Sequence, residues 1–149
     1  MKITGREFES IIKKDPSWCK NLKEEVEVTT FVDLSKSKIT HLSPFITFSG
    51  IDKQGRSADF ENCKNLEAAT GTFQEFVDFS YSGVTTIKDL IIKNPNKNKD
   101  KAAFFGCPIK YASKEYRNGE FLFEEGIIYI SNRKDEINKI KSEANNIEL

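Results

Sequence analysis

The sequence predicts a mainly β fold, a short β-solenoid of stacked coils with an N-terminal and a C-terminal helical cap. Two observations predict this class. A short phrase of residues recurs along the chain at intervals that are alternately long and short, and helical patterns flank the recurring region on both sides. Repeats of roughly 20–50 residues are typical of coils that stack and bury one another's apolar faces.

Each phrase opens on an aromatic residue or a leucine, its anchor, which is followed by a small residue and then by two spaced apolar residues. The five anchors are Leu34, Phe60, Phe79, Phe104 and Phe123. We expect each anchor to point into the core from a short strand, with the small residue placed where the chain turns. Such coils need neighbours, because one coil cannot bury its apolar face alone.

Two tandem units, residues 33–77 and 78–122, each contain one long and one short coil. The long coils carry additional residues at 49–57 and 94–101, which are rich in Gly, Asn, Lys or Asp. These compositions predict two loops that protrude on one side of the stack.

The first cap is predicted over residues 1–25. Thr4 followed by Glu7 is a capping box, and Phe8, Ile11 and Ile12 recur at the spacing of one helical face. The pattern ends before Pro16, which cannot continue a helix.

A strand pattern follows the first cap, because Val26 and Val28 alternate with charged residues. We therefore assign residues 26–130 to the repeat region and residues 131–149 to a C-terminal helix. The whole chain, residues 1–149, is expected to be a single domain.

The phrases resemble leucine-rich-repeat-like β-solenoids, particularly degenerate bacterial and phage forms. In these, a line such as Asp-Phe-Ser-Tyr-Ser-Gly-Val-Thr-Thr-Ile (78–87) alternates with one such as Phe-Glu-Asn-Cys-Lys-Asn-Leu-Glu-Ala-Ala (60–69). The likeness covers roughly residues 26–130. It implies only that the protein presents flat surfaces to other proteins, since the family has no shared catalytic residues.

Composition limits the classes of partner. The 149 residues contain 23 Lys or Arg and 23 Asp or Glu, so no net field gathers nucleic acid or anionic lipid. No stretch resembles a secretory signal or a membrane span, so we expect a cytoplasmic protein that binds neither nucleic acid nor membrane. Delivery into a host cell without a cleavable signal stays open.

Catalytic and metal-binding sets are weak in this sequence. Cys63 or Cys19 with His41, the only histidine, is the one arrangement that predicts a cysteine-dependent hydrolase. The repeat instead favours a buried structural role for Cys63, and we expect no cofactor and no metal. Asp33, Asp59 and Asp78 precede successive anchors and predict an acidic row on the outer face, which is either solvated or a cation site.

A non-catalytic protein-interaction module, acting as an adaptor, inhibitor or effector-type scaffold, is therefore the leading hypothesis for function. The alternatives are the cysteine-dependent hydrolase and a self-assembling structural protein. Outward-facing aromatics are typical interface anchors, although packing in the core or a crevice is the alternative for either phenylalanine. The candidate binding residues are Phe31, Lys36, Asn62, Phe76, Tyr81 and Tyr111.

Overall fold

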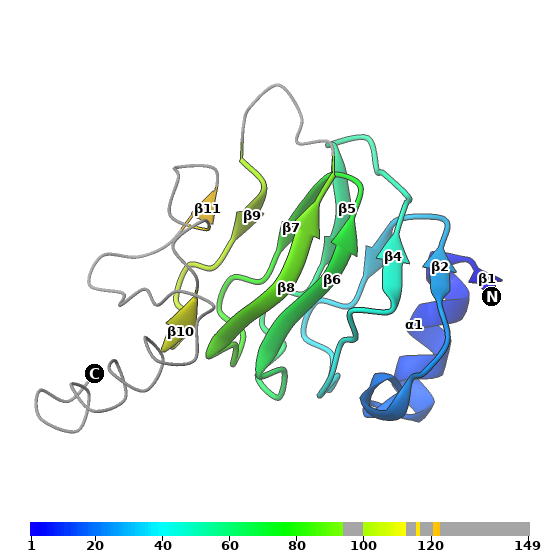
Figure 1. Ribbon diagram of the computed structural model, residues 1–149, viewed down its shortest axis with the longest axis horizontal. Helices are drawn as coiled ribbons and strands as arrows, with labels where there is room; N and C mark the ends of the chain where they lie inside the picture. The colour runs from blue at the N-terminus through cyan, green and yellow to red at the C-terminus, as the bar shows by residue number, and fades with distance from the viewer. Residues whose placement is uncertain (94–99, 113–115, 117–120, 123–149) are drawn as a thin grey trace, which may run out of the picture.

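Two parallel β-sheets dominate the computed structural model, which describes residues 1–93, 100–112, 116 and 121–122 (Figure 1). The first sheet has the order β1-β2-β4-β6-β8-β10 and the second the order β11-β9-β7-β5-β3. The strands of the first sheet are β1 (Lys2–Ile3), β2 (Val26–Val28), β4 (Ile46–Phe48), β6 (Ala68–Phe73), β8 (Thr86–Ile92) and β10 (Tyr111–Ala112). Those of the second are β3 (Val32–Asp33), β5 (Arg56–Asp59), β7 (Phe76–Asp78), β9 (Ala102–Ala103) and β11 (Phe121–Leu122).

From β2 onward the chain alternates between the two sheets, so that each return adds a parallel strand beside the previous one. Helix α1 (Gly5–Lys14) and a short 3-10 helix, η1 (Trp18–Asn21), lie between β1 and β2 in the sequence. Parallel neighbours require such a crossover, because a tight hairpin can join only antiparallel strands.

The predicted fold class, a mainly β solenoid with a helical cap at each end, is wrong. The structure is α/β-like, with two parallel sheets and, among the described residues, one α-helix. Helix α1 belongs to a β1-α1-β2 crossover and packs beside β3. The prediction missed β1 because two residues show no alternation. The C-terminal helix predicted at 131–149 lies outside the described residues. Repeat spacing indicates how often the chain returns to a sheet, and it does not indicate whether the sheets close into one coil.

The anchors do mark equivalent places in the second sheet. Leu34, Phe60, Phe79 and Phe104 directly follow β3, β5, β7 and β9, and all four are buried. Phe123 lies outside the described residues. The repeated phrase therefore corresponds to the end of a strand and the turn that follows it.

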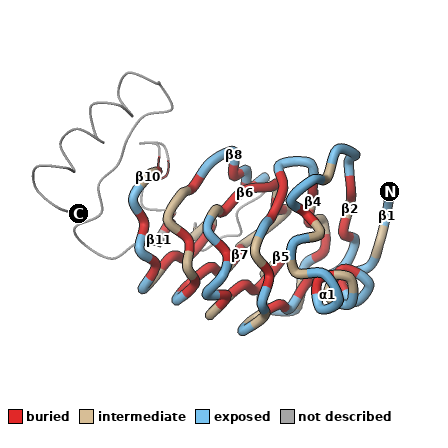
Figure 2. The backbone as a smooth tube through the Cα atoms, turned by 90° about the horizontal axis from the view of Figure 1, so that it is seen from below, coloured by how far each residue is buried: buried red, intermediate tan, exposed pale blue. Residues whose placement is uncertain are grey.

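Two groups of stacked phenylalanine rings fill the space between the sheets. Figure 2 shows along the backbone that buried residues recur in successive strands. On the first sheet, Phe48 and Phe73 stack with ring centroids 4.6 Å apart. On the second, Phe60, Phe79 and Phe104 stack at 5.3 and 5.2 Å. Edge-on contacts join the two groups, such as Phe60 with Phe73 at 6.3 Å, so both sheets share one core.

The loop predicted at 49–57 connects β4 to β5, and its last residues already belong to β5. Asp52 organises the loop by accepting hydrogen bonds from the backbone N–H groups of Gln54 (2.9 Å) and Arg56 (2.8 Å). Of the second predicted loop, residues 94–99 lie outside the described part of the chain. No helix among the described residues has the length and apolar character needed to cross a bilayer.

Candidate binding groove

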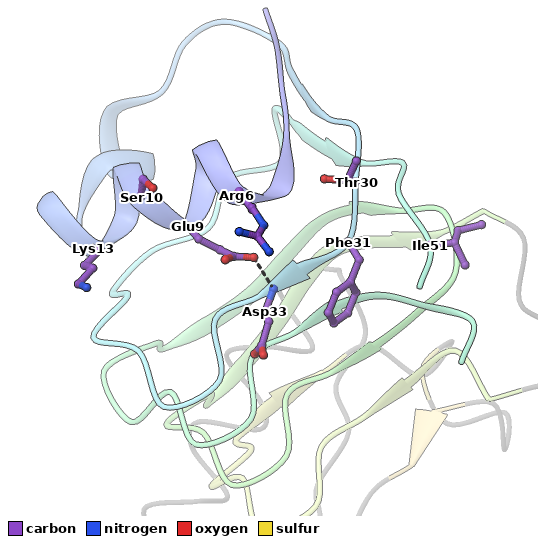
Figure 3. A pocket seen from close by; sticks show the side chains of 8 residues that line it. All are labelled: Arg6, Glu9, Ser10, Lys13, Thr30, Phe31, Asp33 and Ile51. Carbon is purple, nitrogen blue, oxygen red and sulfur yellow. Dashed lines mark hydrogen bonds between the residues drawn. The ribbon is translucent and has the colours of Figure 1, made fainter. Parts of the chain in front are cut away.

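An open groove of about 730 Å³ lies between α1 and the segment that leads into β3 (Figure 3). One wall is formed by four side chains of α1, which are Arg6, Glu9, Ser10 and Lys13. The opposite side is formed by Thr30, Phe31, Asp33 and, from the loop between β4 and β5, Ile51. The groove thus combines an aromatic ring and an aliphatic side chain with charges of both signs.

Local sequence fixes the helical wall. The side chain of Thr4 accepts a hydrogen bond from the backbone N–H of Glu7 (3.1 Å), and the Glu7 carboxylate accepts one from the Thr4 N–H (2.9 Å), which confirms the predicted capping box. Phe8 and Ile12 are buried against the core. The positions that line the groove are spaced by three, one and three residues, so they share the polar face of α1.

A hydrogen bond ties this wall to the sheet. Glu9 Oε2 accepts from the backbone N–H of Asp33 at 2.9 Å, as drawn in Figure 3. Strand β3 is the last strand of the second sheet on this side, and its outer edge would otherwise present unpaired backbone groups. Glu9 therefore satisfies one edge donor and sets the distance between α1 and β3.

The Phe31 ring is held from the other side by Arg56. The Arg56 guanidinium lies 5.0 Å from the ring centroid, within the range of a cation–π contact. It also pairs with Asp52 (2.8 Å) and Asp59 (3.4 Å). Burial alone would raise the pKa of Asp52, but the hydrogen bonds and the charge of Arg56 lower it.

Close backbone contacts around Thr30 and Phe31 make the groove preformed. The backbone N–H of Gly5 donates to Thr30 Oγ1 at 2.7 Å. Gly50 approaches from the loop between β4 and β5, and a Cβ added to Gly50 would overlap the backbone of Thr30. Only glycine permits this approach, so the loop that carries Ile51 is positioned directly against the floor of the groove.

The predicted binding residues do not form one surface. Lys36, Asn62 and Tyr81 lie together in one row, along the turns that follow β3, β5 and β7. Neighbouring turns are joined by backbone hydrogen bonds, from Lys36 N–H to the Glu61 carbonyl (2.8 Å) and from Asn62 N–H to the Ser80 carbonyl (3.0 Å). All three row residues adopt left-handed backbone angles, with φ of 61°, 60° and 60°.

The other three predicted residues lie elsewhere. Phe31 lines the groove, and Phe76 opens β7 as the register partner of Arg56. Both rings are half-buried. Tyr111 belongs to the first sheet, where it pairs with Thr86, and so it cannot act with the row on the turns.

The acidic row predicted at Asp33, Asp59 and Asp78 occupies equivalent register positions in β3, β5 and β7, but Asp59 is buried, so the row is not a solvated outer face. Each carboxylate accepts a hydrogen bond from the backbone N–H two residues later, at 3.1, 2.9 and 2.8 Å. The row therefore closes the turns after the strands. No group of three or more metal-ligating side chains occurs among the described residues.

The cysteines are buried and unpaired. Burial raises the pKa of the Cys63 thiol, which donates to the Leu34 carbonyl at 3.0 Å. Burial and the charge of Asp15 raise the pKa of Cys19 to about 12. A nucleophilic thiol requires the opposite shift and an accessible sulfur, so this geometry lends the hydrolase hypothesis no support. His41 is exposed and bonds through Nδ1 to Thr40 Oγ1 (2.8 Å).

Sequence reasoning missed Arg6, Lys13 and Ile51. The first two could have been found, because a helix with Phe8 and Ile12 on one face must direct another set of side chains away from the core. Ile51 could not have been found, since its place depends on how the loop folds against Thr30.

No family model, curated protein or solved structure matches this chain.

Proposed function

We propose that this protein is a non-catalytic protein-interaction module that holds an extended segment of a partner in the groove between α1 and β3. The observation that carries the proposal is the preformed groove itself. Its walls are set by the Glu9 bond to Asp33 and by the close approach of Gly50, so binding does not have to pay for ordering them.

The apolar side of the groove favours a protein ligand. Phe31 is half-buried with one ring face against Arg56, and the Ile51 side chain is 49% exposed at the rim. An aromatic ring beside an exposed aliphatic side chain offers a partner a place to bury an apolar residue, which is the usual centre of an interface.

A matched pair of substitutions tests this proposal. Ile51 in the groove and Ile91 on β8 of the first sheet are both exposed isoleucines, at 49% and 54%. We expect Ile51→Arg to abolish retention of a partner that the wild-type protein retains from native lysate, and Ile91→Arg to leave it unchanged. Circular dichroism of both variants establishes that they are folded.

The opposite pattern, loss with Ile91→Arg and retention with Ile51→Arg, would place the interface on the first sheet and contradict the proposal. A hydrolytic activity of the purified protein that disappears in Cys63→Ala would contradict its non-catalytic part. If the retained partner is a second copy of this chain, sedimentation at several concentrations will show a wild-type oligomer that Ile51→Arg dissociates.

A further inference from the structure

We infer that the groove selects an acidic segment that carries an apolar residue, bound in an extended conformation with its carboxylates against Arg6 and Lys13. This inference rests on the proposed function and names the chemistry of the partner.

The charged side chains that line the groove differ in whether they already have partners within the protein. Glu9 Oε2 is bonded to the backbone N–H of Asp33, and Asp33 Oδ1 accepts from both the N–H (3.1 Å) and the Oγ (2.7 Å) of Ser35. Neither Arg6 nor Lys13 forms an ion pair with any described residue. One oxygen of each carboxylate is thus bonded within the protein, whereas the two cations have no anionic partner among the described residues and remain for a ligand of opposite charge.

The two cations have a defined spacing. They are seven residues apart on one face of α1, which corresponds to about 10 Å along the helix axis. An extended chain covers that distance in about three residues. We therefore expect two acidic residues separated by two to four positions.

The apolar residue is placed by the other wall. Figure 3 shows Arg6 on the side of α1 that faces Phe31, with Ile51 beyond the ring. A ligand whose carboxylate meets Arg6 consequently brings its neighbouring side chain over Phe31 and Ile51. The expected motif is an apolar residue next to the acidic residue that Arg6 binds.

A nucleic acid strand fits this groove less well than a peptide does. Glu9 and Asp33 lie between or opposite the two cations and would repel a continuous line of phosphates. A peptide carboxylate is a discrete charge and avoids them, and neutral residues can lie over the acidic positions.

Selection from a phage-displayed library tests the inference on the full chain. The library presents random peptides of about ten residues, longer than the roughly three-residue span between the cations. Peptides are selected on the wild-type protein and then measured by fluorescence anisotropy against two double variants. Arg6→Glu with Lys13→Glu changes the groove, and Lys14→Glu with Lys20→Glu makes the same change of net charge at exposed positions outside it.

We expect the selected peptides to combine acidic and apolar residues. Their binding should weaken at least about tenfold in the groove variant and stay within about twofold of the wild type in the control, with lower affinity at high salt. Selected peptides that are neutral or basic, yet lose binding with Ile51→Arg, would overturn this inference and leave the proposed function standing. Peptides that bind equally to wild type and Ile51→Arg, or that an oligothymidine strand displaces, would overturn both.

Discussion

The core between the sheets and the groove beside α1 are built in opposite ways. In the core, equivalent residues from successive returns of the chain contact one another, as in the stack of Phe60, Phe79 and Phe104. The groove uses residues that occur once, from α1, from the segment before β3 and from the loop that carries Ile51. The repeated residues therefore stabilise the core, and the residues that do not repeat form the groove.

The largest expected effect concerns the core. Phe60 is fully buried and contacts rings from both sheets, so Phe60→Ala should lower the free energy of unfolding by about 3–5 kcal/mol. Phe45→Ala, at a ring that is 39% exposed, should cost less than about 1 kcal/mol. Urea denaturation measures both, and equal losses would show that the stack is not the centre of the fold.

A smaller effect on stability is expected from two glycine substitutions, one beside the groove and one among the turns that follow the strands. Gly50→Ala and Gly83→Ala each add a Cβ that overlaps a neighbouring backbone, that of Thr30 beside the groove and that of Lys64 among the turns. We expect both variants to lose about 1–3 kcal/mol of stability, because the chain must shift to admit the methyl group.

Only Gly50→Ala should also weaken binding of a groove ligand, which anisotropy with a selected peptide can measure. Gly83→Ala serves as its control of similar stability. If both variants bind the peptide as the wild type does, the groove is not positioned by the contact between Gly50 and Thr30.

The difference between repeated and single features also explains what the sequence could and could not predict. Anchors at equivalent positions are visible as a pattern, and the four that the structure describes are buried after strands of one sheet. The capping box at Thr4 and Glu7 is local and was equally visible. The capping box depends on short-range chemistry, whereas the anchors are visible because they recur along the chain.

The fold class was wrong for a related reason. The pairing of Lys2–Ile3 with Glu27–Val28 turns α1 into a crossover, and a strand so short leaves no periodic signal. The groove needs in addition the bond between Glu9 and the Asp33 N–H, a contact between residues 24 positions apart. Among the predicted binding residues, only Phe31 lies in it, because tertiary packing and not alternation decides which outward side chains meet.

The smallest expected effect is on the pH dependence of stability. Asp59 and Asp52, the two ion-pair partners of Arg56, should change the free energy of unfolding with pH in opposite directions. Burial and the charges of Asp78 and Asp33 raise the pKa of Asp59, despite its hydrogen bond from the Glu61 N–H. The folded protein then holds the proton of the Asp59 carboxyl more tightly than the unfolded chain does. The contribution of Asp59 to stability is therefore present at low pH and is lost as the pH rises above about 4. The wild type should therefore lose stability relative to Asp59→Asn over that range.

Asp52, whose pKa is lowered, should behave in the opposite sense. Its contribution is present above the unfolded pKa and is lost as the pH falls below about 4, so the advantage of the wild type over Asp52→Asn should shrink there. Urea denaturation between pH 3 and pH 7 measures both slopes. If the two stability differences changed with pH in the same direction, the opposite pKa shifts of Asp59 and Asp52 would be contradicted.

Amide hydrogen exchange with and without a selected peptide tests the central claim, that the non-repeating groove is the binding surface. We expect added protection in residues 5–14 and 30–33, while the strands of the first sheet exchange as before. Added protection confined to the first sheet, with no change beside α1, would contradict it.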